Sequence, residues 1–297
     1  MQTRAEIQRD TQEASMVRLA LPKGRMASGI EKLLKDAGIE LSQTQRGYRP
    51  QLSLADWDAK SLKPQSIVEM LAAGSRDVGF AGADWVAERN ADLVELLDTR
   101  LDPVRVVAAA PIGFWPPEKS ERTLSIATEY VRITTQWAAE QGLNAQVIRS
   151  YGATEVYPPE DADFIVDNTA TGETLRANQL EIFADLMSSS TRLYANPRAL
   201  ENPDLREKID DFVILLRSVL EARSRVLLEL NVARGDLDAV LAVLPCMRDP
   251  TIAQLANESG FAVRAAVAKK DLPNLIAQVR AKGGSDILVS QPKQILP

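Results

Sequence analysis

The sequence contains no histidine and only one cysteine, Cys246. Without histidine, the common zinc sites and the catalytic pairs in which a histidine activates serine or cysteine are excluded. A single cysteine excludes an internal disulfide framework, and its position before Met247 in an apolar neighbourhood favours a packed thiol. Any chemistry therefore depends on carboxylates, hydroxyls, amides, and the cationic side chains of lysine and arginine.

Long hydrophobic runs are also missing. The longest candidate, Val104 to Trp115, is interrupted by Arg105 and Pro111 and is shorter than the roughly 18 to 20 residues that span a bilayer. Residues 1–15 mix acids and bases and lack the apolar segment of a secretory signal, so we interpret them as a polar N-terminal extension. These features predict a cytoplasmic protein that does not enter a membrane.

An excess of basic residues is absent as well. The formal net charge is −6, which argues against general nucleic-acid binding but allows a local cluster of lysine and arginine around a phosphorylated small molecule. The chain has 297 residues, of which 45% are hydrophobic. It is therefore long enough for two or three domains with buried cores.

The stretch DFIVDNTATGETLR, residues 163–176, carries the strongest chemical signal. Phe164 to Val166 predicts a strand that ends at Asp167, and Glu173 to Arg176 predicts the start of a helix. The small hydroxyl and glycine residues between them suit a phosphate, and Asp167 suits the hydroxyls of a sugar. An ordinary strand-to-helix turn capped by threonine is the alternative for this motif alone.

A second ligand-like turn follows the first predicted strand, Val17 to Leu21. The residues Pro-Lys-Gly-Arg, 22–25, lead from it into a helix predicted from Met26 to Ala37. Lys23 and Arg25 therefore lie at the C-terminal edge of a strand, where open α/β sheets bind ligands. Two solvated charges in a tight turn are the alternative.

Another predicted strand, within residues 77–84, contains Gly79 and Gly82, which indicate close approach of the backbone to other backbone or to a ligand. Two α/β units are predicted, joined by crossing strands around a cleft. The candidate strands around the junctions are Leu93 to Leu97, Val104 to Ala110, Leu180 to Leu186 and Thr191 to Ala195.

The rest of the sequence predicts a further pair of strands, two helices and a C-terminal module. Ile39 to Trp57 predicts a pair of extended strands around a turn, and Pro64 is well placed as the first residue of a helix. Leu205 to about Arg223 predicts a long amphipathic helix. Beyond it, a βαββαβ order fits if a short strand lies near Thr251 to Ala256.

These motifs together resemble the long, allosterically regulated form of the ATP phosphoribosyltransferase family, the first enzyme of histidine biosynthesis. They follow the family order over nearly the whole chain from Val17. The matching pieces are LALPKGRM (19–26), TQR (44–46), GSRDVGFAGADW (74–85), IATEY (126–130), YGATEV (151–156), DFIVDNTATGETLRANQLEI (163–182), STRLYANP (190–197), and the C-terminal LLELNV, VLAVLPCMRDPT and GGSDILV.

The resemblance implies an α/β fold with a two-lobed, periplasmic-binding-protein-like catalytic region and a C-terminal ferredoxin-like (ACT-like) regulatory domain. Catalytic lobe I covers residues 16–110 and is completed by about 196–222, lobe II covers 111–195, and the regulatory domain covers 223–297. The implied reaction transfers the 5-phosphoribosyl group of phosphoribosyl pyrophosphate to N1 of the adenine of ATP and releases pyrophosphate. Histidine is the implied feedback inhibitor, Mg²⁺ the implied cofactor, and a homo-oligomer, dimer or hexamer, the implied assembly.

Site residues follow from the same resemblance, position by position. Lys23, Arg25 and Arg46 are the implied catalytic cations, with Arg49 as the alternative to Arg46. Gly24, Lys63 and Glu155 line the substrate site. The implied phosphoribosyl pyrophosphate residues are Asp167, Asn168, Thr169, Ala170, Thr171, Gly172, Glu173 and Thr174. The implied effector residues are Asn231, Met247 and Thr251, and no protein ligand for a metal is assigned.

The chain departs from the family pattern at residues 62–67 and 157–161, which bears on substrate affinity more than on reaction type. The implied chemistry suits a protein without histidine, because adenine N1 is unprotonated at neutral pH and needs no general base. In the effector region, Met247 as core filler and Thr251 as a helix N-cap are the alternatives.

Two other functions remain open from the sequence. A two-lobed α/β cleft also fits a non-enzymatic binder of small molecules, although the signal peptide of a periplasmic protein and the helix-turn-helix of a transcriptional regulator are not found. An ordinary nucleobase phosphoribosyltransferase usually carries two adjacent acids after the apolar strand, whereas Asp167 is followed by Asn168.

Overall fold

A computed structural model describes residues 15–42, 47–114, 122–256 and 258–296. Arg46, residues 1–14 of the extension predicted for residues 1–15, and residues 115–121 lie outside these ranges. The chain divides into two compact units, one of Met1–Lys35 with Ile39–Asp211 and one of Asp36–Gly38 with Phe212–Pro297. The division falls within a long helix, α8 (Pro203–Ser224), upstream of the boundary predicted at residue 223.

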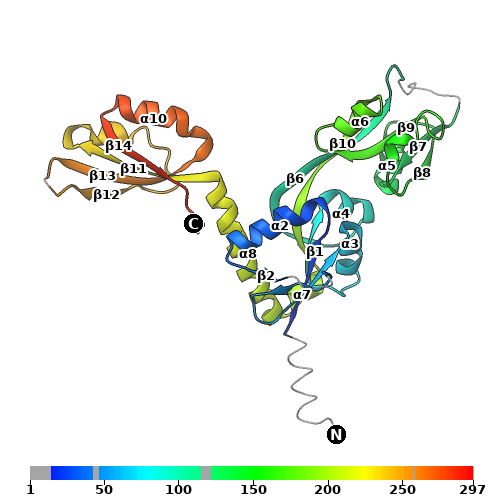
Figure 1. Cartoon of the computed structure of the whole chain (residues 1–297), viewed down its shortest axis with the longest axis horizontal. Coiled ribbons are helices and arrows are strands. Elements are labelled where there is room, and N and C mark those ends of the chain that lie inside the picture. The colour runs from blue at the N-terminus through cyan, green and yellow to red at the C-terminus, as the bar shows by residue number, and fades with distance from the viewer. Residues whose placement is uncertain (1–14, 43–46, 115–121, 257, 297) are drawn as a thin grey trace, which may run out of the picture. The chain divides into compact units, whose positions relative to one another are not determined.

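The larger unit is built on one eight-stranded sheet, which can be followed in Figure 1. Its first part is parallel, and so is its last part, whereas the two middle strands run antiparallel to each other. These two parallel parts are the sheets of the two lobes. In sheet order the strands are β4 (Trp57–Leu62), β1 (Val17–Pro22), β5 (Val78–Gly82), β10 (Leu180–Ala195), β6 (Val94–Pro111), β9 (Phe164–Thr169), β7 (Leu124–Thr128) and β8 (Ala145–Arg149).

The two crossing strands are continuous, which corrects the prediction of four shorter strands. β6 has 18 residues and β10 has 16, and they pair with each other over their length. Arg100 and Asp102, between the two shorter strands predicted for this region, have positive φ angles of 56° and 47°. Bulges in the β6–β10 ladder absorb these left-handed residues, so the pairing continues past them.

Helical segments connect the strands of this sheet and pack against it. Pro64 begins α3 as predicted, at a position where its missing N–H is not needed. The predicted pair of extended strands is present as the antiparallel strands β2 (Leu41–Ser42) and β3 (Gln51–Leu52), while residues 43–46 between them lie outside the described ranges. The helical segments are α2 (Arg25–Asp36), α3 (Pro64–Ala72), α4 (Ala83–Arg89), α5 (Val131–Glu140), the 3-10 turn η1 (Thr154–Val156), α6 (Glu173–Ala177) and α7 (Pro197–Glu201).

Alternating residues of β6 supply two hydrophobic clusters. Val106, Ala108 and Ala110 belong to one cluster with Phe164, whereas Val107 and Ala109 belong to another with Leu175 and Leu180. Successive side chains of a strand point to opposite faces, so the middle of the sheet is buried on both faces.

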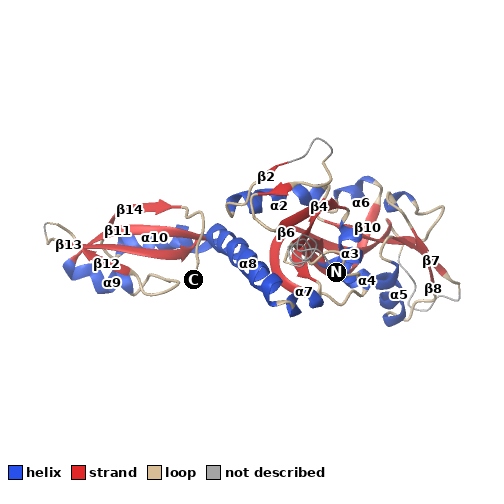
Figure 2. Cartoon of the chain, turned by 90° about the horizontal axis from the view of Figure 1, so that it is seen from below, coloured by secondary structure: helices blue, strands red, loops and turns tan. Residues whose placement is uncertain are grey.

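The smaller unit contains the predicted βαββαβ order, including the short strand near Thr251. Its sheet has the order β12-β13-β11-β14 with antiparallel neighbours, which is the ferredoxin-like arrangement. The elements, coloured by type in Figure 2, are β11 (Arg225–Ala233), η2 (Arg234–Asp236), α9 (Leu237–Leu241), β12 (Thr251–Gln254), β13 (Gly260–Ala268), η3 (Lys269–Asp271), α10 (Leu272–Ala281) and β14 (Gly284–Ser290).

Only one face of this second sheet is packed by its helices. Every second residue of β11, from Val226 to Val232, is buried with Val240 of α9 and Leu275 of α10. The intervening residues of β11 are half-buried on the other face. No helix within the described ranges is both long and apolar enough to cross a membrane.

Candidate active site

The loop that follows β9 is organised by its own hydrogen bonds. We call residues 167–174 the anion loop. Thr169 is buried, and its Oγ1 accepts a hydrogen bond from the N–H of Gly172 at 2.8 Å. Gly172 has a φ of +76°, a left-handed conformation that a residue with a side chain adopts only with strain. The loop is therefore shaped before any ligand arrives.

The anion loop forms one wall of a cavity of about 430 Å³, which we call the loop cavity. Seven of the eight sequence-predicted loop residues line it, and Gly172 alone supports it from behind. Predicted Arg25 and Glu155 also line it, so residues from both lobes meet there. The complete lining is Arg25, Glu129, Gly152, Thr154, Glu155, Asp167, Asn168, Thr169, Ala170, Thr171, Glu173, Thr174 and Leu175.

Acidic groups dominate the electrostatics of the loop cavity. Burial raises the pKa of Asp167 to about 7, the backbone N–H of Asn168 opposes this shift, and the Glu129 and Glu155 carboxylates add to it. Burial also raises the pKa of Glu129, against the influence of Lys63 and Arg149. Glu129 lies in the quoted IATEY segment, but sequence reasoning gave it no role at the site.

A second cavity of about 320 Å³, the turn cavity, adjoins the first. Arg25 and Asn168 line both cavities, so the two spaces meet at these side chains. The complete lining is Lys23, Arg25, Met26, Pro64, Gly82, Asp84, Trp85, Asp102, Val104, Asn168, Ser189, Ser190 and Thr191. The C-terminal ends of β1 and β5 thus contribute as expected for an α/β sheet.

Gly24 makes the turn between β1 and α2 possible. Its φ is +72°, and a Cβ there would touch nothing within 4 Å, so the backbone angle alone favours glycine. The ammonium group of Lys23 lies 3.3 Å from the centre of the Tyr48 ring, a cation–π contact that orients it. Arg25 is exposed and begins α2.

Three predicted substrate residues outside the anion loop, Gly24, Arg49 and Lys63, are absent from both cavity linings. Arg49 is exposed, and its guanidinium lies 3.4 Å from the Asp58 carboxylate. Lys63 is the exposed N-cap of α3 and acts on Glu129 through charge. Arg46 lies outside the described residues.

A buried hydrogen-bonded network behind the site was not predicted. We call Asp84, Ser189, Tyr130 and Asn168 the polar network. Asp84 accepts hydrogen bonds from Ser189 at 2.7 Å and from the Tyr130 hydroxyl at 2.6 Å, and the Asn168 amide nitrogen donates to the Tyr130 oxygen at 2.9 Å. The signal was present in Gly82, because a Cβ there would collide with the Asp84 carboxylate.

Contacts between α4 and α5, which belong to different lobes, lie beside this polar network. The buried Glu88 carboxylate accepts from the N–H groups of Arg132 and Ile133, both at 3.0 Å, and so caps α5. The Arg132 guanidinium donates in return to the Ala87 carbonyl at 2.9 Å. The Trp85 and Tyr130 rings are 4.8 Å apart. The lobes are therefore fixed to each other beside the two cavities.

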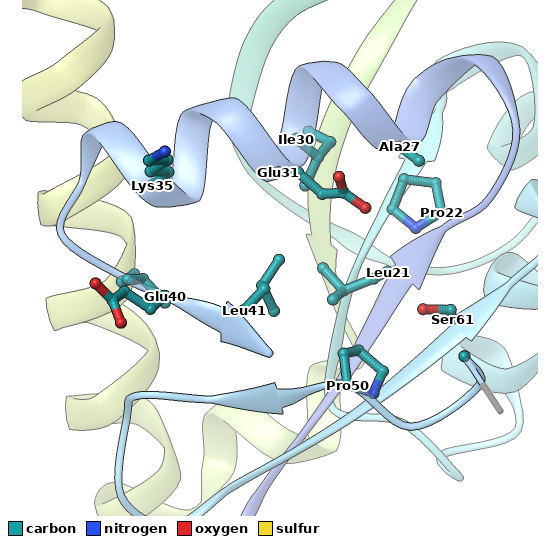
Figure 3. Close-up of a pocket in the computed structure, with 12 residues that line it drawn as sticks. Leu21, Pro22, Ala27, Ile30, Glu31, Lys35, Glu40, Leu41, Pro50 and Ser61 are labelled. Atoms are coloured by element: carbon teal, nitrogen blue, oxygen red, sulfur yellow. The ribbon is translucent and has the colours of Figure 1, made fainter. Parts of the chain in front are cut away.

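A third cavity, of about 380 Å³, lies between α2 and the β2–β3 hairpin (Figure 3). Aliphatic residues such as Leu21, Ile30 and Leu41 line it together with Glu31 and Glu40. None of the described sequence-predicted site residues belongs to its lining. Lys23, Arg25, Glu155 and the anion loop except Gly172 line the other two cavities instead.

The predicted effector residues of the smaller unit do not share one pocket. Met247 and Thr251 line a pocket of about 220 Å³ together with Arg248, Asp249 and Arg264. Asn231 lies outside this lining, and its amide donates to Asp286 at 3.0 Å. The structure thus joins two of the three residues and separates the third, because Asn231 on β11 pairs with Ser285 of β14 at the other edge of the sheet.

Comparisons with known proteins agree over nearly the whole chain. A family model described as ATP phosphoribosyltransferase matches residues 63–218, and one described as HisG, C-terminal domain, matches residues 222–292. The ATP phosphoribosyltransferase of Pelotomaculum thermopropionicum is 37% identical over 95% of this chain and 99% of its own length. That of Chlorobium luteolum is 36% identical over 93% and 96%.

A solved structure is similar as well. The ATP phosphoribosyl transferase (HisG:HisZ) complex from Thermotoga maritima matches with a TM-score of 0.63 and 29% identity, over 69% of this chain and 99% of the matched chain.

Proposed function

The chain belongs to the ATP phosphoribosyltransferase family and catalyses the first step of histidine biosynthesis, and we propose that it does so where the loop cavity and the turn cavity meet. The observation that carries this proposal is that Arg25 and Asn168 line both cavities. A ligand in each cavity would have its reacting end at the shared boundary, as a transfer between two substrates requires.

Phosphoribosyl pyrophosphate occupies the loop cavity in this proposal. The preformed anion loop offers the hydroxyls of Thr171 and Thr174 and backbone N–H groups to the 5-phosphate. Asp167, which lies in the last part of the β9 ladder before Thr169, accepts from a ribose hydroxyl. ATP occupies the turn cavity, beside the Trp85 ring and the cations Lys23 and Arg25.

Catalysis then depends on position and charge. Adenine N1 attacks C1 of the ribose, the bond from C1 to the pyrophosphate oxygen breaks, and pyrophosphate leaves with the bonding electrons. Positive charge develops on the ribose and negative charge on the leaving group. The Glu129, Glu155 and Asp167 carboxyls suit the first, and the guanidinium of Arg25 suits the second. Lys23 adds a second cation from the turn cavity, and Arg46 remains a predicted third.

Mg²⁺ fits this donor set as a companion of the substrate. Among the described residues, no group of three or more carboxyl, histidine or cysteine side chains is placed to hold a metal ion. The four carboxyl side chains that line the loop cavity would repel a bare pyrophosphate, and Mg²⁺ carried by the pyrophosphate would offset that repulsion. Glu129 and Glu155 would face the hydration shell of the ion.

Regulation belongs to the smaller unit in this proposal. The pocket that holds Met247 and Thr251 combines Arg248 and Arg264 with Asp249, a charge set that matches the carboxylate and ammonium of an amino acid. Histidine is the proposed inhibitor there, and assembly into dimers or hexamers of the same chain is proposed with it. A cytoplasmic location stays a prediction.

The test is a pyrophosphate-release assay. We expect release only when ATP, phosphoribosyl pyrophosphate and Mg²⁺ are all present, and less release when histidine is added. Release without ATP would indicate hydrolysis and would contradict the proposed transfer. Release that depends on both substrates but is unchanged by histidine would remove the regulatory part alone.

A further inference from the structure

The polar network connects four parts of the larger unit that are separate in sequence. Asp84 lies in the first turn of α4, Ser189 in β10, and Asn168 at the end of β9, with Tyr130 between β7 and α5. Tyr130 is fully buried, and Asp84 and Ser189 are 5% and 6% exposed. A carboxylate buried to this extent is retained only when its oxygens are paired, so each hydrogen bond in the network has a defined direction.

The direction of the first bond follows from the backbone. The Ser189 oxygen accepts the N–H of Asp84 at 3.1 Å, so its own hydrogen is free to point to the Asp84 carboxylate at 2.7 Å. The direction of the second follows from burial. Burial and the neighbouring Asp84 raise the pKa of Tyr130 far above its ordinary value, so the phenol keeps its hydrogen and donates it to Asp84.

These directions determine which way the Asn168 amide faces. A Tyr130 oxygen that already donates can only accept from Asn168, so the NH₂ end of the amide lies on Tyr130, at 2.9 Å. Asp167 Oδ1, 3.4 Å from the same nitrogen, is a second acceptor on that side. The remaining polar atom of the side chain, Oδ1 of Asn168, is an acceptor, and Asn168 lines both cavities.

We propose that Asp84 and Tyr130 are positioning residues that hold the Asn168 amide so that its oxygen accepts a hydrogen bond from a substrate at the boundary of the two cavities. The donor is an O–H of the ribose or the exocyclic N–H of adenine. Gly82 supports the polar network, because only a residue without Cβ leaves room for the Asp84 carboxylate to lie against Ser189. This inference rests on the proposed placement of both substrates.

The contacts between α4 and α5 also help to fix the geometry of the polar network across the two lobes. Glu88 and Arg132 hold α4 against α5, so the distance from Asp84 to Tyr130 is set by helices as well as by the hydrogen bond. A group held by rigid elements presents its ligand atom within a narrow range, and small displacements at a reacting centre reduce rates by up to about 100-fold.

The test is a double-mutant cycle with Tyr130→Phe and Asn168→Ala. We expect Y130F to lower kcat/KM about 10- to 100-fold, and to have almost no further effect in the N168A background, because the tyrosine acts through the asparagine. A larger rise in the KM for phosphoribosyl pyrophosphate identifies the ribose as donor, and one in the KM for ATP identifies adenine. Losses that multiply in the double variant, or a Y130F loss below twofold, would overturn the proposal.

Tyr194→Phe is the matched control, since Tyr194 is a buried tyrosine of the same unit that lines neither cavity. We expect it to change thermal stability without this change in kcat/KM. If Y130F does not fold, Asp84→Asn keeps the shape and takes its place in the cycle, with the same two outcomes. Thr174→Ala tests the proposed placement of phosphoribosyl pyrophosphate separately from the polar network. If this substitution leaves the KM for phosphoribosyl pyrophosphate unchanged, the substrate placement is wrong. If the KM rises, the placement holds and the double-mutant cycle tests the polar network alone.

Discussion

The two units place their polar groups in different ways. In the larger unit, the middle of the sheet is covered on both faces, and polar groups are buried in networks at strand ends, around cavities shared by both lobes. In the smaller unit, helices cover one face, and the predicted effector residues lie on or beside the other, divided between two places. The difference is consistent with the proposal that chemistry takes place in the larger unit and that histidine binds at the smaller pocket of the other unit.

The largest effect is expected from a substitution that lowers kcat and leaves the free energy of unfolding nearly unchanged. Arg25→Ala removes an exposed cation that lines both cavities, so we expect kcat to fall about 100-fold or more. The free energy of unfolding should change by less than about 0.5 kcal/mol, as for other exposed positions. Arg206→Ala, which removes an exposed arginine paired with Asp210 on α8, is the control and should retain full activity. Equal loss of stability and activity in R25A would make Arg25 a structural residue.

The next effect concerns pH. The pKa of Asp167 is raised to about 7 in the folded protein, above its value of about 4 in the unfolded chain. Ionising Asp167 therefore costs stability, and the free energy of unfolding should fall as pH rises from about 4 to 7, then stay lower. Asp167→Asn should remove this decline, which amounts to a few kcal/mol. Denaturant unfolding at pH 4.5 and pH 8 would measure it.

Activity should move in the opposite direction with the same group. Because ionised Asp167 is the better acceptor for a ribose hydroxyl, kcat/KM for phosphoribosyl pyrophosphate should rise through about pH 7 in the wild type. This rise should be absent in Asp167→Asn. A pH profile that is the same in both proteins would assign the titration to another group.

A smaller effect tests whether the anion loop is preformed. Gly172→Ala imposes a side chain on a left-handed residue and brings its Cβ to 3.2 Å from the Arg176 guanidinium. We expect a stability loss of about 1 kcal/mol and a rise of about 10-fold in the KM for phosphoribosyl pyrophosphate. Gly142→Ala is matched in φ, at +67°, and has open space around it. It should lose similar stability with an unchanged KM.

The smallest effect on turnover is expected in the second unit. Met247→Ala and Thr251→Ala should leave kcat within twofold and raise the histidine concentration for half inhibition by about 5- to 10-fold. Asn231→Ala should change it less, because its amide is engaged with Asp286 outside that pocket. Inhibition curves of the three variants would rank them. If N231A has the largest effect, the pocket assignment is wrong.

Some features of the fold could be predicted from the sequence and others could not, for physical reasons. The strand beginning at Phe164, the Gly24 turn and the short strand at Thr251 were predictable, because periodicity and glycine positions are local signals. The predicted end of the first of these at Asp167 was too early, because pairing with β6 extends the strand to Thr169. The continuity of β6 and β10 was not, since it depends on bulged pairing between segments some 80 residues apart.

Site prediction followed the same division. Residues of the anion loop were found from one stretch of sequence, and all but Gly172 line the cavity. Asp84, Tyr130 and Glu129 were missed, because their roles arise only when α4, α5 and β9 come together. The close approach expected at Gly79 is confirmed, since a Cβ there would lie 2.9 Å from the Cβ of Ala20.

Calorimetric titration of phosphoribosyl pyrophosphate with Mg²⁺ into the wild type and a Thr171→Ala/Thr174→Ala variant tests the placement of this substrate most directly. We predict that the dissociation constant rises about 10-fold or more in the variant, as expected when two hydroxyl donors to a phosphate are lost, while the dissociation constant for ATP stays within twofold. An unchanged affinity for phosphoribosyl pyrophosphate, or a loss confined to ATP, would contradict it.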